Sequence, residues 1–543
     1  MTQLSTPHIT LDGVTYSLPD GSMLFSDLHE QFDQQATGLV GRNGAGKTVL
    51  ARILAGQLAP ASGRCVRHGS VHYLAQQVAP APGATIADLA GVRAELDALV
   101  RIEAGSVAME DFDLVGDRWD LPQLLQQELD RSDLGRHDAS TPVSALSGGE
   151  AMRVALAGAM VSGADFLILD EPSNHLDRHH RQALIAQLQR WPHGLLVISH
   201  DRQLLDTMAR IVELSPQGLH SYGGNYSFYA AARAQERQSA LDQLDQRKLE
   251  RQREEQAMRT QRERQDQRQA RGARQGKQAN QARILLGRQK ERSESSAGKL
   301  RQRQDAAREQ LSAQVRAAAQ QVHGDAEIVL HALPALPTVR GARGRMVELD
   351  AVELPFVPAA TRHITLSLTA GQRVGVIGPN GCGKSTLLKV LAGRIAALTG
   401  SCQVTDACVY LDQRLADLDP ARTVLEHLMA ANRTVAQGTL RTWLAQLGLD
   451  AQKIVAPSGM LSGGERLKAA LACVLYADPP AQLLLLDEPD NHLDLPSLQA
   501  LETMLRSYRG ALVVVSHDDA FLDNLALTDR LSAGEHGWRL DPW

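Results

Sequence analysis

Short apolar runs, each followed by a glycine-rich or acidic turn, recur in both halves of the chain. The runs TGLVG (37–41) and RVGVIG (373–378) are typical of buried strands, and each is followed by a glycine-rich loop and an apolar helical pattern. FLILDE (166–171) and LLLLDE (483–488) predict two more buried strands, each ending in paired carboxylates. Strands that alternate with helices in this way predict an α/β fold in each half.

A different pattern begins at Ala230. Between residues 231 and 320 there is no aromatic residue and no proline. The lack of glycine and proline from 225 to 271 predicts one long helix, and the two glycines within 272–281 predict a turn. A second helix is expected to run from there towards Val322. Such a helical hairpin is too polar to form a core.

Length and composition set the broad organisation. A chain of 543 residues is too long for one core, so we predict three parts at 1–230, 231–322 and 323–543. The apolar runs are too short to span a bilayer, and the N-terminus lacks the basic and apolar regions of a signal peptide. Five cysteines without metal or disulfide spacing fit a reducing cytoplasm.

Charge is distributed unevenly along the chain. The net charge is −5, but segment 231–320 contains 22 Lys and Arg residues against 12 Asp and Glu residues, so the remainder of the chain is strongly acidic. Basic residues gather around the predicted turn: Arg268, Arg271, Arg274, Lys277, Arg283 and Arg288. A basic tip on an acidic protein suits nucleic-acid phosphates, and without aromatics it would recognise charge and shape. The alternative is a solvated, highly charged spacer.

Two segments carry the phosphate-loop pattern GxxxxGK[ST], namely GRNGAGKT (41–48) and GPNGCGKS (378–385). The glycines allow backbone N–H groups to surround phosphates, while Lys47 and Lys384 would reach the terminal phosphates. Thr48 and Ser385 would each offer a hydroxyl to Mg²⁺. Both loops stand between an expected strand and an expected helix, which is the context this motif requires.

Further strings repeat in the same order in each half. LSGGE occurs at 146–150 and 461–465, and EPSNHLD (171–177) is matched by EPDNHLD (488–494). His200 and His517 each follow the glutamate of their half by 29 residues. The loop lysines are 337 residues apart and the LSGGE serines, Ser147 and Ser462, are 315 apart, so the first half holds about 22 extra residues before its LSGGE string.

In this order and spacing, the strings resemble Walker A, Q-loop, signature, Walker B, D-loop and H-switch of the ATP-binding cassette superfamily. The NHLD string, the two cassettes and the charged linker resemble its F family, whose members act on ribosomes. The resemblance covers about 1–230 and 323–543. It implies two P-loop NTPase cassettes joined by a long α-helical hairpin. It also implies ATP and Mg²⁺ as cofactors, no membrane insertion, and a monomer whose cassettes pair with each other.

The resemblance also assigns roles to residues. Glu171 and Glu488 would orient and deprotonate the attacking water, and His200 and His517 would touch the γ-phosphate. Asp170 and Asp487 would join Thr48 and Ser385 at the metal, and Asp177 and Asp494 would cross the interface between cassettes. The residues expected to bind ATP are Gly41, Asn43, Gly44, Gly46, Lys47, Thr48, Gly378, Asn380, Gly381, Gly383, Lys384, Ser385, Thr386, Phe356, Gln76, Gln413, Ser147, Gly148, Gly149, Ser462, Gly463 and Gly464. In this arrangement each ATP lies between the Walker A loop of one cassette and the LSGGE string of the other.

Two departures from the family pattern concern the first half. In the second half, Phe356 stands where an aromatic residue of the family would stack on adenine. The matching position in the first half is occupied by Leu18. Because side chains alternate along a strand, Tyr16 is expected to share the face of Leu18, so we predict a weaker or differently built adenine site. The 22 extra residues would form either a ribosome-contacting arm or a fuller helical subdomain, and we favour the subdomain.

The leading interpretation is a cytoplasmic ATPase that binds the ribosome, through ribosomal RNA and transfer RNA, and acts on translation. Within it, the polar tip favours a housekeeping factor that relieves stalled elongation over a protein that displaces antibiotics. An ATPase subunit of a membrane transporter would need a separate membrane partner and leaves the basic hairpin unexplained. A DNA-maintenance ATPase is disfavoured because the chain has no zinc pattern and only a short linker.

Overall fold

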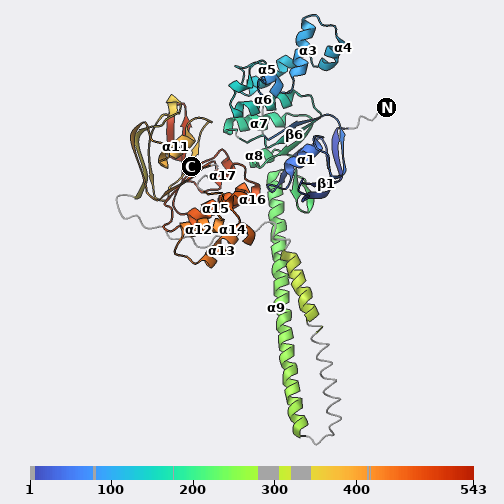
Figure 1. Cartoon of the computed structure of the whole chain (residues 1–543), viewed down its shortest axis with the longest axis vertical. Coiled ribbons are helices and arrows are strands. Elements are labelled where there is room, and N and C mark those ends of the chain that lie inside the picture. The colour runs from blue at the N-terminus through green and yellow to red at the C-terminus, as the bar shows by residue number, and fades with distance from the viewer. Residues whose placement is uncertain are drawn as a thin grey trace. The chain divides into compact units, whose positions relative to one another are not determined.

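A computed structural model describes residues 6–76, 81–174, 176–278, 302, 305–319, 344–412, 415 and 418–543 (Figure 1). It separates into two compact units, one made of 1–229 with 327–543 and the other of 230–326. We call the described residues up to 229 lobe 1 and those from 344 onward lobe 2. In the described part of the chain, no helix combines the length and apolar character needed to cross a membrane.

Lobe 1 contains a six-stranded sheet with strand order β5-β6-β7-β3-β8-β9. Its strands run parallel except for β9, which pairs antiparallel with β8. A three-stranded antiparallel sheet, in the order β2-β1-β4, forms a second layer. The strands are β1 (His8–Ser17), β2 (Met23–Phe32), β3 (Ala36–Gly41), β4 (Ser62–His68), β5 (Val71–Leu74), β6 (Phe166–Asp170), β7 (Gly194–Ile198), β8 (Arg210–Ser215) and β9 (Gly218–Tyr222).

Lobe 2 repeats this architecture. Its six-stranded sheet has the order β14-β15-β16-β12-β17-β18, and its three-stranded sheet the order β11-β10-β13. The strands are β10 (Arg345–Glu353), β11 (His363–Thr369), β12 (Arg373–Ile377), β13 (Thr399–Val404), β14 (Cys408–Leu411), β15 (Leu483–Asp487), β16 (Ala511–Val515), β17 (Asp529–Gly534) and β18 (Gly537–Pro542). The predicted α/β fold is confirmed in both lobes.

One helix lies between the two sheets of each lobe. In lobe 1, α1 (Lys47–Leu54) buries Leu50 and Ile53 in the same core as Ile9 of β1 and Ile168 of β6. In lobe 2, α11 (Lys384–Leu391) packs in the same way between β10, β11 and the large sheet. Since each helix directly follows the carboxyl end of a central strand, the loop before it lies where parallel sheets bind ligands.

A helical subdomain is inserted between β5 and β6 of lobe 1 and between β14 and β15 of lobe 2. The first contains α2 (Ile86–Leu89), α3 (Arg93–Glu103), α4 (Met109–Val115), α5 (Leu121–Arg131) and α6 (Gly148–Val161). The second contains α12 (Val424–Ala431), α13 (Gln437–Gln446), α14 (Ala451–Val455) and α15 (Gly463–Leu475). Each large sheet also carries the helices that follow its acidic strand, α7 (Arg178–Gln189) with α8 (Arg202–Leu205) and α16 (Leu495–Ser507) with α17 (Asp519–Asp523).

The extra residues of lobe 1 lie within its helical subdomain. A bridge pairs Thr85 with Pro142 in lobe 1 and Thr423 with Pro457 in lobe 2, which brackets the longer insert in lobe 1. The additional helices are α3 and α4, and Leu99 and Val115 from them join the core formed by α5 and α6. This packing agrees with the favoured interpretation of a fuller subdomain.

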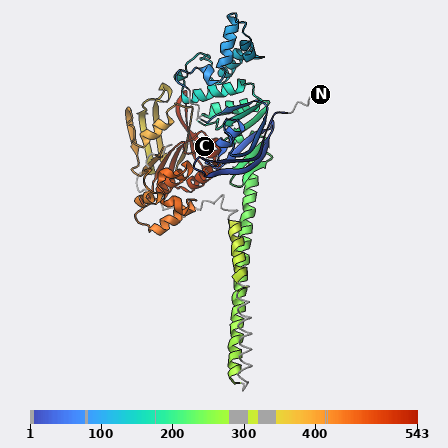
Figure 2. The same ribbon diagram turned by 45° about the vertical axis from the view of Figure 1, so that its right-hand side comes forward.

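The linker begins as one long helix, α9 (Tyr226–Gln278), which Figures 1 and 2 show without interruption. Its backbone stays helical through Gly272 and Gly276, so the prediction that a turn starts at 272 was wrong. Glycine costs about 1 kcal/mol in a helix, and a long helix tolerates two of them. Residues 305–319 are also helical, and ion pairs of Arg262 with Asp305 and of Glu255 with Arg308 set them antiparallel to α9.

Candidate functional site: two phosphate loops and their partners across the lobes

The last glycine of each phosphate loop cannot be replaced by a residue with a side chain without a clash. Gly46 and Gly383 precede α1 and α11 with φ of 99° and 103°. A Cβ at Gly46 would lie 2.7 Å from Leu24 Cδ2, and one at Gly383 would lie 2.5 Å from Val357 Cγ1. The glycines let each loop turn tightly into its helix, so that the N–H groups at the helix start are directed at the loop, where a phosphate binds favourably.

The two loop lysines are fixed inside their loops. Lys47 Nζ donates a hydrogen bond to Gly41 O at 2.8 Å, and Lys384 Nζ donates to Gly378 O at 2.9 Å. Burial lowers the pKa of both lysines, while nearby carboxylates such as Glu171 and Glu488 oppose that shift. Each ammonium is thus a desolvated cation set among acids, which strengthens its attraction to a phosphate.

The aspartates that end β6 and β15 each meet a hydroxyl of the same lobe. Ser385 Oγ donates to Asp487 Oδ1 at 2.9 Å. Burial raises the pKa of Asp170, and the hydroxyls of Thr48 and Tyr73 oppose this shift. Among the described residues, Asp170 Oδ1 is buried without a hydrogen-bond partner. A hydroxyl beside a carboxylate that still has an acceptor to offer fits Mg²⁺, which takes few protein ligands together with substrate phosphates.

Two tyrosines that the sequence interpretation overlooked hold these aspartates. Tyr73 Oη donates to Asp170 Oδ2 at 3.3 Å, and Tyr410 Oη donates to Asp487 Oδ2 at 3.1 Å. They occupy the same position in VHYLA (71–75) and CVYLD (408–412), the strings that directly precede Gln76 and Gln413. Their repetition in both halves was the signal that could have found them.

The two candidate general bases share an unusual backbone conformation. Glu171 and Glu488 have φ of 51° and 49°, in the left-handed region that non-glycine residues rarely adopt. His200 Nε2 lies 3.5 Å from Glu171 Oε1, and His517 Nε2 lies 3.7 Å from Glu488 Oε1. A histidine therefore lies beside the glutamate in each lobe, a proximity that the sequence analysis did not predict.

The surroundings of the two glutamates differ. The Glu171 side chain is 10% exposed and that of Glu488 is 24% exposed. Burial raises the pKa of Glu171, against the opposing effect of Lys47. Asn491 Nδ2 donates to Glu488 Oε2 at 2.6 Å and holds that carboxylate in place. The two bases are therefore not equivalent.

Both histidines are neutral in this environment. Burial, together with Lys47, lowers the pKa of His200. Burial, Lys384 and Arg181 lower the pKa of His517 to about 4. A neutral imidazole can donate or accept one hydrogen bond at each ring nitrogen, according to its tautomer, without adding charge to the site.

The D-loop aspartates contact the opposite phosphate loop, as the resemblance implied. Asn43 N donates to Asp494 Oδ2 at 2.8 Å, and Asn380 N donates to Asp177 Oδ2 at 3.2 Å. Each aspartate also caps its own helix, Asp494 accepting from Ser497 N and Asp177 from His180 N. One carboxylate thus fixes the start of a helix and a loop of the other lobe.

The structure locates some, but not all, of the remaining residues predicted to bind ATP. Ser147 and Ser462 cap α6 and α15, so Gly148, Gly149, Gly463 and Gly464 form the first turns of these helices. Their position against the opposite phosphate loop stays a prediction. Gln76 follows the end of β5, while Gln413 lies outside the described residues.

The adenine platform differs between the lobes. Phe356 is 94% exposed and directly precedes Val357, whose side chain meets the phosphate loop at Gly383. Strand pairing of β1 with β4 and of β10 with β13 matches Leu18 to Phe356. Leu18 lies beyond the end of β1, and Tyr16 packs on Phe25, so strand alternation does not bring Tyr16 beside Leu18 as expected. The turn at 18–22 replaces the strand that the alternation argument assumed.

Only part of the predicted basic tip lies in the described residues. Arg268 and Arg271 are exposed on α9. Arg274 and Lys277 belong to the same helix, but their side chains lie outside the described part. Arg283 and Arg288 also lie outside the described residues.

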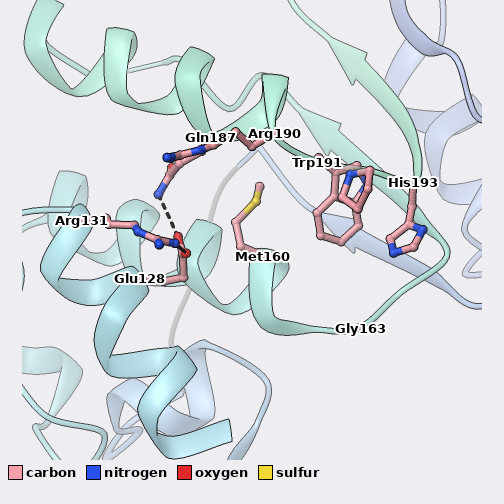
Figure 3. A pocket seen from close by; sticks show the side chains of 9 residues that line it. Glu128, Arg131, Met160, Gly163, Gln187, Arg190, Trp191 and His193 are labelled. Carbon is pink, nitrogen blue, oxygen red and sulfur yellow. Dashed lines mark hydrogen bonds and ion pairs between the residues drawn. The ribbon is translucent and has the colours of Figure 1, made fainter. Parts of the chain in front are cut away.

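A separate pocket of lobe 1, shown in Figure 3, lies between α5, α6 and α7. Gln187 Nε2 donates to Glu128 Oε2 at 3.1 Å, and Glu128 also pairs with Arg131 (Figure 3). The lining contains none of the predicted site residues. Its contacts join the helical subdomain to the helix that starts at the D-loop, which is a structural role.

A family described as "ABC transporter" matches residues 30–174 and 361–491. The chain is 32% identical over 547 residues to "Energy-dependent translational throttle protein EttA" of Mycobacterium tuberculosis, covering 95% of this chain and 87% of that protein. It is 30% identical to "ABC transporter F family member 5" of Arabidopsis thaliana, covering 90% and 70%. It is 29% identical to "Ribosome protection protein VmlR" of Bacillus subtilis, covering 95% and 85%.

Solved structures support the fold. The chain is similar to archaeal aABCE1, described as an archaeal ribosome recycling factor, with a TM-score of 0.55 and 19% identity over 97% of this chain and 89% of that one. At that identity the likeness concerns the fold alone. The duplicated family match, the relatives and the paired loops together place the chain in the F family of ATP-binding cassette proteins, as an ATPase with two cassettes.

Proposed function

We propose that this ATPase binds the ribosome in the cytoplasm and modulates translation, as a housekeeping factor that relieves stalled elongation. The observation that carries the proposal is the separation of charge, with a basic helical linker on a chain whose remainder is strongly acidic. Relatives named for translational throttling and for ribosome protection support the same partner. The polar tip favours the housekeeping role over drug displacement.

The linker is suited to contact RNA phosphates. Described α9 residues such as Arg268 and Arg271 are exposed, whereas many acidic side chains nearer the lobes are paired with arginine or lysine, as Asp245 is with Lys248. Repulsion between the acidic lobes and nucleic acid leaves the tip as the favourable contact. Ribosomal RNA and transfer RNA are the proposed partners, recognised through charge and shape.

ATP would be held between the lobes of a single chain. Lys47 and Lys384 neutralise its terminal phosphates, and the opposite lobe contributes the helix N-termini that begin at Ser147 and Ser462. Thr48 with Asp170, and Ser385 with Asp487, would hold Mg²⁺, which when bound neutralises charge that develops on the phosphates. Phe356 supplies a stacking face for adenine in lobe 2.

Hydrolysis requires a positioned water and a base. Glu171 and Glu488 accept the proton from water in their ionised form. His200 and His517, being neutral, would hold the γ-phosphate by a hydrogen bond. Closure of the lobes favours ribosome binding, and hydrolysis releases it, because ATP stabilises the closed arrangement.

The test combines Glu171→Gln with Glu488→Gln. Glutamine keeps the size of the base but cannot take the proton, so ATP still binds while hydrolysis slows by about 10²–10⁴-fold. The variant should accumulate on ribosomes with ATP in sucrose gradients and inhibit peptide synthesis. Glu535→Gln, at an exposed turn, serves as the control. If the double variant hydrolyses no ATP yet neither sediments with ribosomes nor slows synthesis, the ribosome proposal fails.

A second variant tests the linker. Reversing Arg271, Arg274, Lys277 and Arg283 to Glu should weaken ribosome binding and flatten its salt dependence, by about 0.7–0.9 in the log–log slope for each lost phosphate contact. Basal ATPase should not change. The control reverses four exposed arginines of lobe 2, Arg433, Arg441, Arg506 and Arg539. Equal salt slopes for both variants would remove the linker from RNA binding.

A further inference from the structure

Three arginines of lobe 1 contact acidic or carbonyl groups of lobe 2. Arg202 Nη1 donates to Glu502 Oε1 at 2.7 Å, and Arg178 Nε lies 3.0 Å from Asp519 Oδ2. Arg181 Nη1 donates to the backbone oxygen of His517 at 2.9 Å. We call Arg178, Arg181 and Arg202 with Glu502 and Asp519 the pairing patch. All of its cations belong to lobe 1 and all of its carboxylates to lobe 2.

The central pair of the patch is buried. The side chains of Arg202 and Glu502 are 9% and 11% exposed. Tyr226, the first residue of α9, shares a hydrogen bond with Arg202 and is itself buried. An ion pair shielded from water in this way costs much to break, because the remaining charge stays buried without its partner.

The patch does not follow the internal repeat. Between the D-loops and the end of the H-switches the two lobes align at the constant spacing of 317 residues. At that spacing Arg178, Arg181 and Arg202 correspond to Leu495, Leu498 and Asp519. Glu502 corresponds to Ile185.

One more acidic residue of lobe 2 near the patch has no acidic counterpart in lobe 1. Asp490 of lobe 2 stands where lobe 1 has Ser173, and Arg181 of lobe 1 acts on its charge. The D-loop contacts are reciprocal: Asp177 of lobe 1 accepts from Asn380 N of lobe 2, and Asp494 of lobe 2 accepts from Asn43 N of lobe 1. The lobes therefore meet through two kinds of contact, one repeated in both directions and one found in a single direction.

The one-directional contacts distinguish the possible pairings. If two copies of lobe 1 met in this geometry, Arg178 of one would face Arg202 of the other. If two copies of lobe 2 met, Asp519 would face Glu502. Both arrangements place like charges together. One member of each clash, Arg202 or Glu502, is nearly buried, whereas Arg178 and Asp519 are 53% and 24% exposed, so the repulsion acts mainly through the buried member.

We propose that the pairing patch is a recognition surface that restricts lobe 1 to a lobe 2 partner, normally that of its own chain. The repeated D-loop contacts build the two ATP sites, and the pairing patch decides which lobes come together. A pair of identical lobes would present matching loops and signatures, so the repeated motifs alone would not reject it. This inference requires only that ATP hydrolysis needs paired lobes, and it does not depend on the ribosome.

Two full-length variants test the proposal. Chain X carries Arg178→Glu and Arg202→Glu, so both of its lobes are acidic at the patch. Chain Y carries Glu502→Arg and Asp519→Arg, so both are basic. Each alone should lose ATPase activity by about a hundredfold, since a buried ion pair becomes a repulsion.

An equimolar mixture of X and Y should regain activity. Lobe 1 of X then meets lobe 2 of Y, and lobe 1 of Y meets lobe 2 of X, so sedimentation velocity should show a species of twice the chain mass. Activity should rise with the square of the protein concentration. A single chain with all four substitutions should be active as a monomer.

Neutral variants separate charge recognition from loss of folding. Arg178→Gln with Arg202→Gln removes the attraction without adding repulsion, so it should lose less activity than chain X. Full activity of X or Y alone, no recovery in the mixture, or equal losses for the neutral and reversed variants would overturn the proposal. None of these measurements involves ribosomes, so they stand apart from the outcome of the sedimentation test described for the proposed function.

Discussion

Replacing Asp494 with serine separates two contacts made by a single carboxylate. Oδ1 accepts a hydrogen bond from Ser497 N at 3.0 Å and caps α16. Oδ2 accepts from Asn43 N of the other lobe at 2.8 Å. Serine is a good helix cap but has only one side-chain oxygen, so Asp494→Ser keeps the cap and loses the contact across the lobes. Asp494→Ala loses both.

The size of the effect follows from the charge and burial of Asp494. A hydrogen bond to a charged group contributes about 1.5–3 kcal/mol, and the residue is 7% exposed, so solvent screens it little. Since about 1.4 kcal/mol corresponds to a factor of ten, pairing at this site should weaken about 10- to 150-fold. The alanine variant should lose about a further 1 kcal/mol of folding stability through the missing cap.

The assay measures kcat/KM for ATP together with the melting temperature. Both variants should lower kcat/KM at least tenfold, and Asp494→Ala should melt at a lower temperature than Asp494→Ser because it also loses the cap. Asp177→Ser is the matched variant at the other site, where Asn380 N lies 3.2 Å from Oδ2. Wild-type kcat/KM in Asp494→Ser would refute the role of the contact, and equal melting temperatures of the serine and alanine variants would refute the cap.

Two further predictions concern the unequal lobes. Phe356→Ala should raise the nucleotide dissociation constant of its site, since a stacking face contributes about 1–3 kcal/mol, whereas Leu18→Ala should raise it less. Titration with a fluorescent ATP analogue measures both dissociation constants. Equal losses of affinity would show that Leu18 is wrongly matched to Phe356. Burial and Asp518 raise the pKa of Asp490 from 3.8 to about 7, so between these values the folded chain holds a proton that the unfolded chain has released. Stability should therefore fall as the pH rises through this window. Asp490→Ser introduces the residue that lobe 1 has at position 173, so its melting temperature should rise relative to that of wild type between about pH 5 and pH 8. A difference in melting temperature that does not change with pH would contradict this.

The sequence by itself determined the parts that depend on local order. The apolar runs FLIL (166–169) and LLLL (483–486) became fully buried strands because every residue in them can face a core. Gly46 and Gly383 occur where only glycine permits the turn into the helix, so the phosphate-loop pattern specifies its own backbone. The polar stretch after residue 225 became a helix because it contains no residue that would stop one, and two glycines did not suffice to end it.

Only the tertiary structure decided which distant residues meet. Tyr73 and Asp170 touch because β5 and β6 are neighbours in the sheet, and no periodicity in the chain announces that pairing. Asn43 and Asp494 are 451 residues apart, and Arg202 and Glu502 are 300 apart. A repeat predicts that its two halves share a fold, since both obey the same local rules. The repeat does not predict which residues of the two lobes meet across their contact. An arginine on one surface acquires its partner only when another surface packs against it.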